Sequence, residues 1–406
     1  MSHNSESDLF TTVVVPDAAA VDRLADHFNL YDPELPYVLD EVTDRTRDKC
    51  PVLHTDQQGG YYLITGYNEV AAALATPEVY SSKGGKSLPP VQTVDMPPID
   101  SDDPEHHAFR KLLNRFFSKA GLAKHEPAVR QLAKNAVDSF IDNGKAEFVH
   151  EFAEPIVAGA LCRVILELDD PAQEKHAVKL VNQIGATNSA EAWANITGFI
   201  NDLVTNYKPT GRDTVFDAIA TGEVLGRDVT AEEKLGVVLV LFLGGLDTTK
   251  SMIGGILRHC AQNPELEDRL RDPRWTRSDL DEFLRLDSVV TGLARTVTAD
   301  TELGGVRLHA GDRVMLHYYA ANHDPAKFDH PHQLDFNRAR NPHVAFATGA
   351  HRCIGSNFAR LQIKTAFEEL MPRVQNIRFP DGVTDIAWKP GVAREPMSLE
   401  LLFDKR

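Results

Sequence analysis

One ten-residue run near the C-terminus constrains this chain more than any other feature of its sequence. It reads Phe346-Ala347-Thr348-Gly349-Ala350-His351-Arg352-Cys353-Ile354-Gly355, and an amphipathic helical stretch over residues 357–370 follows it. Glycine lets a backbone approach a flat macrocycle closely, and amide groups at a helix N-terminus stabilise an anionic sulfur. A buried structural cysteine before a helix would account for Cys353 alone, but not for the whole spacing. The run therefore predicts a haem held by the thiolate of Cys353.

Two further motifs precede this run. One is Leu243-Gly244-Gly245-Leu246-Asp247-Thr248-Thr249, and the other is Glu282-Phe283-Leu284-Arg285. In order and separation, the three motifs resemble those of the cytochrome P-450 family, from about Asp32 to near the C-terminus. The chain length is most similar to that of the soluble bacterial members, such as the camphor hydroxylase class. The resemblance implies a mainly α fold with a small β-sheet region. It also implies haem b (iron protoporphyrin IX), buried between a long oxygen-binding helix and the loop of the cysteine ligand.

The composition is that of a globular protein with no evident division. The 406 residues are 42% hydrophobic and contain no flexible linker, low-complexity tract or internal repeat. We expect a flexible segment over residues 1–25, which has no signal-peptide pattern, and a single haem-thiolate monooxygenase domain over 26–406. The net charge of −16 argues against nucleic acid or an anionic membrane as a partner. The longest apolar run, residues 235–246, is interrupted by glycines and too short to cross a bilayer. A cytoplasmic monomer is therefore expected.

Local patterns predict the main elements. Residues 61–67 are typical of a strand and 68–75 of a short helix, while the proline- and glycine-rich segment 81–103 is expected to be a functional loop. From residue 106 to about 180, apolar residues recur with helical period. One long helix is expected over 230–262, because Thr230 can cap it and acidic residues occupy its first turn. Further strands are expected around Val297, at 306–308 and at 314–319.

The long helix carries the residues that we expect to handle oxygen. Gly244 and Gly245 remove side chains where a helix must pass over a haem. By resemblance, Asp247 and Thr248 are the acid–alcohol pair that delivers protons to bound, reduced dioxygen, which requires a hydroxyl and a carboxylate or water relay within hydrogen-bond reach. The alternative is that the glycine pair serves helix packing and that Thr248 bonds back to the preceding turn.

Glu282 and Arg285 lie three residues apart, and thus on one face of a helix. By resemblance they form a structural ion-pair network behind the haem, which a third partner from a later segment, often an arginine, usually completes. The matching stretch here, residues 331–335, offers Gln333. The third member is therefore either this amide or a residue elsewhere.

The two haem propionates need partners that carry positive charge or donate hydrogen bonds. By resemblance the candidates are His106, Arg110, Arg295 and His351, and the alternative for each is a solvated charge. Resemblance also places Phe346 beside the sulfur as a shield, with Gly349 and Gly355 in the cofactor loop. The chain departs from the family at Ala347, where glycine is commoner, and alanine fits less well if the backbone φ there is positive.

Other candidate metal ligands are weaker. Cys50, Cys162 and Cys260 are far apart and match no metal or disulfide pattern, so we expect unpaired thiols or small packed hydrophobes. The histidines at 323, 330 and 332 lie around an Asn-His-Asp-Pro turn signature without a helical i,i+4 pair. They are interpreted as solvated loop histidines rather than as a metal site.

The chain has neither a Gly-x-Gly-x-x-Gly motif after a strand nor a cysteine pattern for an iron–sulfur cluster. A separate ferredoxin-type donor with its reductase is therefore implied. An acidic ferredoxin needs a basic surface, despite the acidic total charge of the chain. The candidates for this surface are Arg110, Lys111, Arg115, Lys119, Arg352 and Arg360.

Substrate contacts are assigned by resemblance to apolar positions. The positions are Val240, Leu243, Val289, Val290, Leu293 and Val392. An apolar lining favours a small hydrophobic substrate, with a terpenoid or an alkyl-aromatic compound as the first expectation. Arg394 is able to anchor a carboxylate, but is expected to be exposed or paired.

Three classes of function fit a haem-thiolate site. The first is a monooxygenase that inserts one atom of O₂ by hydroxylation or oxidative dealkylation. The second is a peroxide-driven peroxygenase, or a protein that rearranges its substrate without oxygen, and the third is a haem sensor. Members that use peroxide tend to lose the acid–alcohol pair, and Asp247 and Thr248 are present here. No output domain is evident, so the monooxygenase is favoured.

Overall fold

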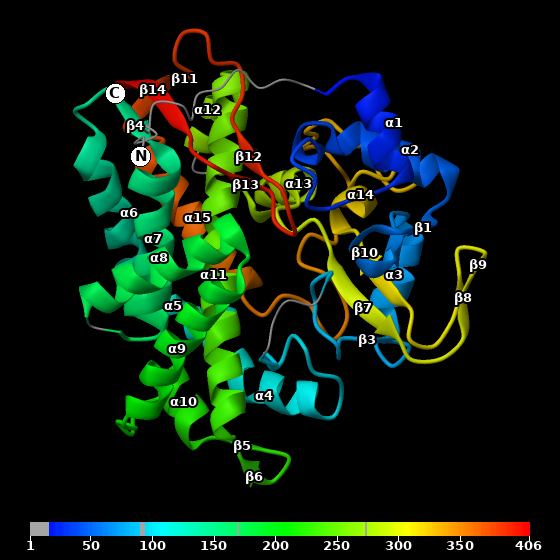
Figure 1. The fold of residues 1–406 in the computed structure, drawn as a ribbon. Helices are drawn as coiled ribbons and strands as arrows, with labels where there is room; N and C mark the ends of the chain where they lie inside the picture. The colour runs from blue at the N-terminus through cyan, green and yellow to red at the C-terminus, as the bar shows by residue number, and fades with distance from the viewer. Residues whose placement is uncertain (1–15, 90–93, 169, 273) are drawn as a thin grey trace, which may run out of the picture.

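The computed structural model describes residues 16–89, 94–168, 170–272 and 274–406. Helices make up most of the described chain, as expected, and the strands form small sheets (Figure 1). The helices are α1 (Ala18–Asp26), α2 (Leu39–Lys49), α3 (Tyr67–Ala75), α4 (Glu105–Phe117), α5 (Lys119–Ala123), α6 (Glu126–Phe140), α7 (Glu154–Gly159), α8 (Pro171–Thr187), α9 (Ala190–Asn206), α10 (Val215–Thr221), α11 (Ala231–Gln262), α12 (Glu265–Arg271), α13 (Arg277–Asp287), α14 (Tyr318–Asn322) and α15 (Ser356–Leu370).

The largest sheet has five strands in the order β1-β2-β10-β7-β3. β10 runs parallel to β2, and the other neighbours are antiparallel. Its strands are β1 (Val52–Thr55), β2 (Tyr61–Ile64), β3 (Tyr80–Ser81), β7 (Leu293–Val297) and β10 (Arg313–Leu316). The smaller sheets are β11-β14-β4 (Val374–Arg378, Glu400–Lys405, Lys145–Glu147), β12-β13 (Trp388–Lys389, Glu395–Pro396), β5-β6 (Glu223–Val224, Arg227–Asp228) and β8-β9 (Thr301–Leu303, Val306–Leu308).

The long helix α11 runs through the middle of the helical half of the molecule, while the five-stranded sheet lies on the other side (Figure 1). Its start is as predicted: the Thr230 hydroxyl accepts from the Glu233 amide, and the Glu233 carboxylate accepts from the Thr230 amide. Within the described residues, α11 is the one helix long and apolar enough to cross a membrane, but 67% of that stretch is buried inside the protein. Burial of this kind is typical of a core helix.

The segment predicted to be flexible, residues 1–25, contains most of a helix in its described part. Residues 18–26 form α1, capped by the Asp17 carboxylate at the Ala20 amide. The helix is held because Val21, Leu24 and Ala25 are buried in a cluster that includes Phe28 and Val42. Residues 1–15 of the expected segment lie outside the described part of the chain.

Two predicted strands are shorter than expected. The strand predicted over 61–67 ends at Ile64, because Gly66 is the N-cap residue of α3. The strand predicted over 314–319 ends at Leu316, where the His317 ring accepts from the Ala320 amide and starts α14. In both places a helix begins within the residues that the sequence pattern assigned to the strand, and the strand ends there.

Candidate haem site

The Cys353 loop is a tight turn immediately before α15. The amide of Cys353 donates to the carbonyl of Phe346 at 2.8 Å, which closes the loop. Gly349 has φ +69°, and a Cβ there would lie 2.6 Å from the carbonyl oxygen of Leu74. Both the left-handed backbone and the close approach require glycine. The loop therefore presents the sulfur just ahead of the N-terminus of α15, which begins at Ser356.

Ala347 adopts the conformation for which alanine is poorly suited. Its φ is +50°, and its amide donates to the carbonyl of Val344 at 2.8 Å. The left-handed region costs a non-glycine residue about 1 kcal/mol. The departure from the family pattern thus falls on a strained position, and the loop still closes.

The thiol of Cys353 has an unusual environment. The residue is exposed, yet the protein around it desolvates the sulfur and so raises the pKa of the thiol. A hydrogen bond from the Gly355 backbone and the charges of Arg110, Arg352 and Arg360 act in the opposite direction and lower it. The sulfur is thus open on one side, with anion-stabilising groups around it. An arrangement of this kind suits a thiolate that binds a metal ion.

The two glycines of α11 have different roles. A Cβ on Gly244 would meet no atom within 4 Å, and this residue is exposed in the middle of a helix whose remaining residues are mostly buried. A Cβ on Gly245 would lie 3.1 Å from the Leu161 side chain. Gly244 therefore leaves open space beside the helix, as expected for a haem site, whereas Gly245 allows helix packing.

The side chains of Asp247 and Thr248 take different partners. The Thr248 hydroxyl donates to the carbonyl of Gly244 at 2.9 Å, which is the back-bonding that we considered as the alternative. An Oδ1 of Asp247 accepts from Nζ of Lys250 at 2.9 Å. Because the Thr248 hydroxyl donates its hydrogen to the Gly244 carbonyl, the lone pairs of its oxygen remain available to another donor. Back-bonding and a role in proton transfer are therefore compatible.

Lys250 organises a buried cluster that the sequence motifs did not reveal. The residue is 4% exposed, and its ammonium also donates to Oδ1 of Asn182 at 2.9 Å and lies 3.6 Å from Glu154. Burial alone would lower the pKa of Lys250, but Asp247, Glu395 and Glu154 outweigh it and raise the pKa. A cavity of about 10 Å³, the size of one water molecule, is lined in part by these groups. The signal that we missed is a single cation in the long stretch of α11 between Lys234 and Arg258.

The four propionate candidates converge. The rings of His106 and His351 have centroids 4.1 Å apart, and burial together with the charges of Arg295, His106 and Arg110 lowers the pKa of His351 to about 3. Arg110 donates to the carbonyl of Arg352 at 2.9 Å, and the buried Arg295 donates to the carbonyl of Ala294 at 2.7 Å. Among the described carboxylates, Asp103 is the one that forms an ion pair with any of these four residues, at 3.5 Å from His106. We call these four residues the propionate cluster. Its excess of donors over acceptors fits a dianionic group.

The Glu282–Arg285 pair is buried, with 1% and 0% of its side chains exposed. Arg285 donates to both carboxylate oxygens of Glu282, at 2.9 and 2.8 Å, and to the carbonyls of Asn322, Pro331 and Gln333. The third partner of the pair is Arg338, whose Nε lies 3.1 and 3.2 Å from the Glu282 oxygens. The suggestion of the Gln333 amide is wrong, because that residue contributes its backbone carbonyl.

The expected substrate residues come from three segments. The backbone of Thr291 donates to the carbonyl of Val392 at 2.8 Å, and Val290 pairs with Ala393, so the segments at 289–293 and 392–393 lie side by side. All six expected residues are partly exposed while many of their neighbours are buried. Arg394, expected to be exposed or paired, instead has its guanidinium 5.0 Å from the Tyr319 ring and 4.7 Å from the Trp388 ring.

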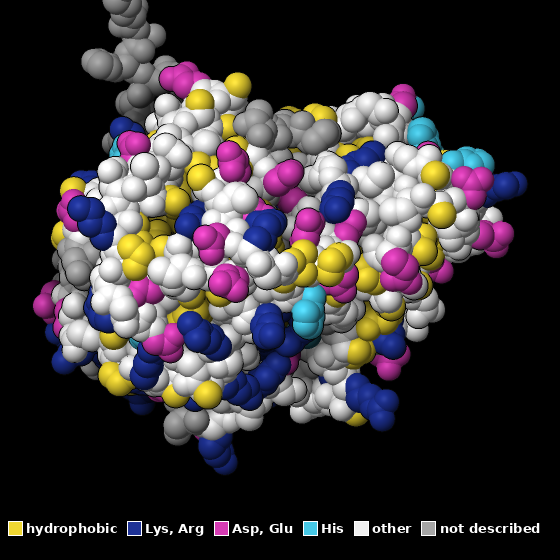
Figure 2. All heavy atoms as spheres, turned by 90° about the horizontal axis from the view of Figure 1, so that it is seen from below, with side chains coloured by type: hydrophobic (Ala, Val, Ile, Leu, Met, Phe, Trp, Pro, Cys, Tyr) yellow, Lys and Arg dark blue, Asp and Glu magenta, His cyan; other side chains and the backbone are white. Residues whose placement is uncertain are grey.

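Four of the six cations expected on the basic surface are exposed. Lys111, Arg115, Lys119 and Arg352 are exposed, and Figure 2 shows Lys and Arg side chains gathered on the side seen from below, where α4 lies in Figure 1. Arg360 does not belong to this surface. It is 9% exposed, its guanidinium binds Asp281 at 2.9 and 2.6 Å, and it lies 4.6 Å from the Phe346 ring.

Comparison with known proteins agrees with this site. The sequence model of the cytochrome P450 family matches residues 275–401. The chain is 29% identical to a steroid C26-monooxygenase of Mycolicibacterium smegmatis, over 85% of this chain and 88% of the relative. It is also 29% identical to a methyl-branched lipid omega-hydroxylase of Mycobacterium tuberculosis, over 78% of each. The crystal structure of CYP108D1 from Novosphingobium aromaticivorans is 25% identical, covers 97% of this chain and 99% of its own, and superposes with a TM-score of 0.84.

The family model, the curated relatives and the solved structures all support a cytochrome P450 of the bacterial type. The protein is thus a haem b oxidoreductase of the monooxygenase class, which uses O₂, an organic substrate and an external redox partner. The residues of the site fit this cofactor. Cys353 offers an accessible sulfur, Gly244 leaves open space and the propionate cluster has donors in excess.

Proposed function

We propose that Cys353 ligates the haem iron and that the protein inserts one oxygen atom from O₂ into a small hydrophobic substrate. The observation that supports this most strongly is the exposed residue Cys353, whose thiol lies in a desolvating, cation-lined loop. Haem bound by a thiolate supplies the chemistry of dioxygen activation. Arg295, Arg110, His106 and His351 would hold the propionates, and Phe346 would cover the sulfur.

We assign proton handling to Asp247 and Thr248. Lys250 fixes the Asp247 carboxylate, and the Thr248 hydroxyl is oriented by its bond to the Gly244 carbonyl. Protons would pass from the Asp247 side of α11 to the Thr248 Oγ1, which presents its lone pairs on the side away from that carbonyl. The presence of both residues is the reason for preferring oxygen over peroxide as the oxidant.

Electrons would come from a ferredoxin served by a reductase. The exposed cations Lys111, Arg115, Lys119 and Arg352 form the surface for an acidic donor, and Arg352 directly precedes Cys353 in the chain. Exposed positive charges mainly accelerate the encounter with a negatively charged donor, and salt screens this attraction. A rise in ionic strength should therefore slow reduction of the protein. A cytoplasmic monomer remains our expectation for the protein in the cell.

The substrate pocket is proposed to be apolar. Val240, Leu243, Val289, Val290, Leu293 and Val392 offer hydrocarbon contacts, which favour terpenoids and alkyl-aromatics. The activities for which the relatives are named add steroids and methyl-branched lipids to the candidates. A spectral-shift screen of the ferric protein against these four groups, with amino acids as polar controls, identifies ligands that change the spin state of the iron. If only strongly polar compounds gave shifts, the apolar pocket would be wrong.

Turnover tests the assignment of Thr248. With ferredoxin, reductase and a ligand from the screen, Thr248→Ala should bind the ligand normally but form several-fold less product per reduced nicotinamide consumed, and should release hydrogen peroxide. The reason is that the hydroxyl acts after dioxygen has bound, so ground-state affinity is unaffected. Thr249→Ala is the neighbouring control. Unchanged coupling in Thr248→Ala would show that protons do not pass through this hydroxyl.

A further inference from the structure

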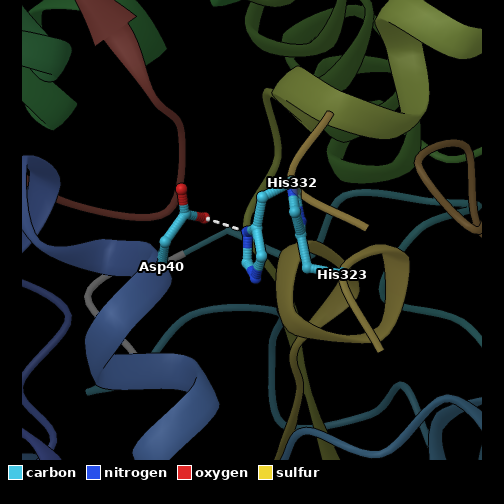
Figure 3. A group of neighbouring side chains, drawn as sticks. All are labelled: Asp40, His323 and His332. Carbon is cyan, nitrogen blue, oxygen red and sulfur yellow. Dashed lines mark ion pairs between the residues drawn. The ribbon is translucent and has the colours of Figure 1, made fainter. Parts of the chain in front are cut away.

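Three side chains outside the haem site come together between α2 and the end of α14 (Figure 3). Asp40 lies on α2, His323 follows α14 directly and His332 lies in the loop beyond. One donor atom from each residue lies within 4.8 Å of the other two. The interpretation of solvated loop histidines is therefore wrong for His323, which is 1% exposed. The helical turn of α14, which the sequence pattern did not predict, places this residue in the interior.

Both histidines have their second ring nitrogen already engaged. Nδ1 of His323 lies 2.8 Å from the carbonyl of Tyr319, so it must donate, and a neutral ring then carries its lone pair on Nε2. The His323 ring is buried, which disfavours its charged form. Nε2 of His332 lies 2.8 Å from Asp44, while its Nδ1 faces Asp40. Metal-binding histidines almost always have such a carbonyl or carboxylate on their other nitrogen.

The carboxylate is also oriented. The Tyr319 hydroxyl donates to Oδ1 of Asp40 at 2.6 Å, and the same oxygen lies 3.2 Å from Nδ1 of His332. A tetrahedral zinc ion with bonds of about 2.0 to 2.1 Å separates its ligands by about 3.3 Å, so these two donors already lie at a suitable separation. The site has a buried side at His323 and an open side, because the side chains of Asp40 and His332 are 46% and 34% exposed.

We propose that Asp40, His323 and His332 bind one zinc ion, with solvent in the fourth position. Two imidazoles and one carboxylate suit zinc, whereas calcium and magnesium prefer oxygen ligands throughout. Without a metal ion, the two ring nitrogens of His332 lie against Asp40 and Asp44, and zinc would take the place of the hydrogen between Asp40 and His332, which is released to solvent. The two rings are stacked with their planes 24° apart, so binding one ion requires a small rotation of the partly exposed His332 ring that keeps its Nε2 on Asp44.

The site would act as a cross-link. It joins α2, near the N-terminus, to the segment after α14, and this segment also supplies the Pro331 and Gln333 carbonyls and Arg338 to the Glu282–Arg285 pair. A ligand that binds only the folded chain stabilises it. Zinc should therefore raise the melting temperature of the protein by several degrees, independently of substrate oxidation.

The test uses the full-length holoenzyme, treated with a chelator and then dialysed against micromolar zinc. Elemental analysis should find one zinc per chain in addition to the haem iron, and X-ray absorption at the zinc edge should show nitrogen and oxygen ligands with two imidazoles. Asp40→Asn and His332→Gln should lose this zinc and the thermal shift while keeping their haem. His330→Gln, a change at an exposed histidine two residues from His332, should keep both.

Four results would overturn the proposal. One is the absence of bound zinc in the wild type. Another is equal zinc binding by the wild type and by both rim variants, Asp40→Asn and His332→Gln, because the ion would then lie elsewhere. The third is a sulfur ligand at the zinc edge, which would place the ion on a cysteine. Dialysis against calcium or magnesium should leave the melting temperature unchanged, and a shift of equal size with either ion would exclude a site selective for zinc.

Discussion

Two clusters of charged side chains in this protein differ in whether the protein itself supplies partners for all their hydrogen-bonding groups. In the Glu282–Arg285–Arg338 network, every oxygen of the carboxylate has protein donors, and Arg285 is saturated by carboxylate and carbonyl acceptors. In the propionate cluster, four donor groups face one another, with Asp103 as their one ion-paired carboxylate among the described residues. The first set is closed and structural. The second set has donors left over, which is the property of a binding site for an anion.

The largest effect is expected from breaking the closed set. Arg285→Lys keeps the positive charge but cannot supply the planar fork that reaches both Glu282 oxygens and three carbonyls, so buried acceptors lose their donors. Such a loss costs about 3–5 kcal/mol. Urea unfolding should show it. Arg274→Lys, in the exposed pair with Asp272, should change the free energy of unfolding by less than about 0.5 kcal/mol. If both substitutions changed the free energy of unfolding equally, the closed set would contribute no more to stability than an exposed ion pair.

A smaller and different effect is expected in the open set. Arg295→Gln removes one charge-assisted partner of a propionate, worth about 1.5–3 kcal/mol, so haem should be lost about 10- to 100-fold faster while the apoprotein stays folded. Transfer of haem to apomyoglobin measures this rate. The matched control is Arg313→Gln, because Arg313 is already bonded to Thr296 and to the carbonyls of Gly85 and Ser87. It should affect stability rather than haem retention, and the reverse pattern would contradict the assignment.

The smallest effect concerns the Lys250 cluster, a second closed set. Burial would raise the pKa of Glu154, but bonds from His150 and Asn182 and the charge of Lys250 outweigh it and lower the pKa to about 2. A lowered pKa in the folded protein adds stability above the unfolded value, and this contribution is lost as the pH falls from about 4.5 towards 2. Glu154→Gln should therefore flatten the acid limb of the unfolding curve by about 1–2 kcal/mol. The exposed Glu191→Gln should leave it unchanged, and an unaltered acid limb in Glu154→Gln would mean that this cluster does not stabilise the fold.

Local signals in the sequence were enough for the elements that carry the haem motifs. The capping residue Thr230 and the acidic first turn predicted the start of α11, and α15 begins within one residue of the predicted position. The motifs also placed the four propionate candidates in one cluster. In each case the informative residues are close in sequence or belong to a family pattern.

Long-range pairing could not be predicted in the same way. Arg338 reaches Glu282 across 56 residues, and Asn182 reaches Lys250 across 68. Nothing in the local pattern of Arg338 or Lys250 identifies the partner, because the loop and helix positions that bring them together depend on the whole fold. His323 is a similar case: the turn signature around it predicted a solvated loop residue, but its burial depends on α2 and α14.

The most direct test of the account is the ligand of the haem iron. The reduced wild-type protein with carbon monoxide should show the red-shifted Soret band of thiolate ligation, and Cys353→Ala should lose this band. Cys50→Ala, which removes a half-buried thiol in another part of the chain, should retain it. A wild-type spectrum typical of histidine ligation, or an unchanged band in Cys353→Ala, would contradict the assignment of the whole site.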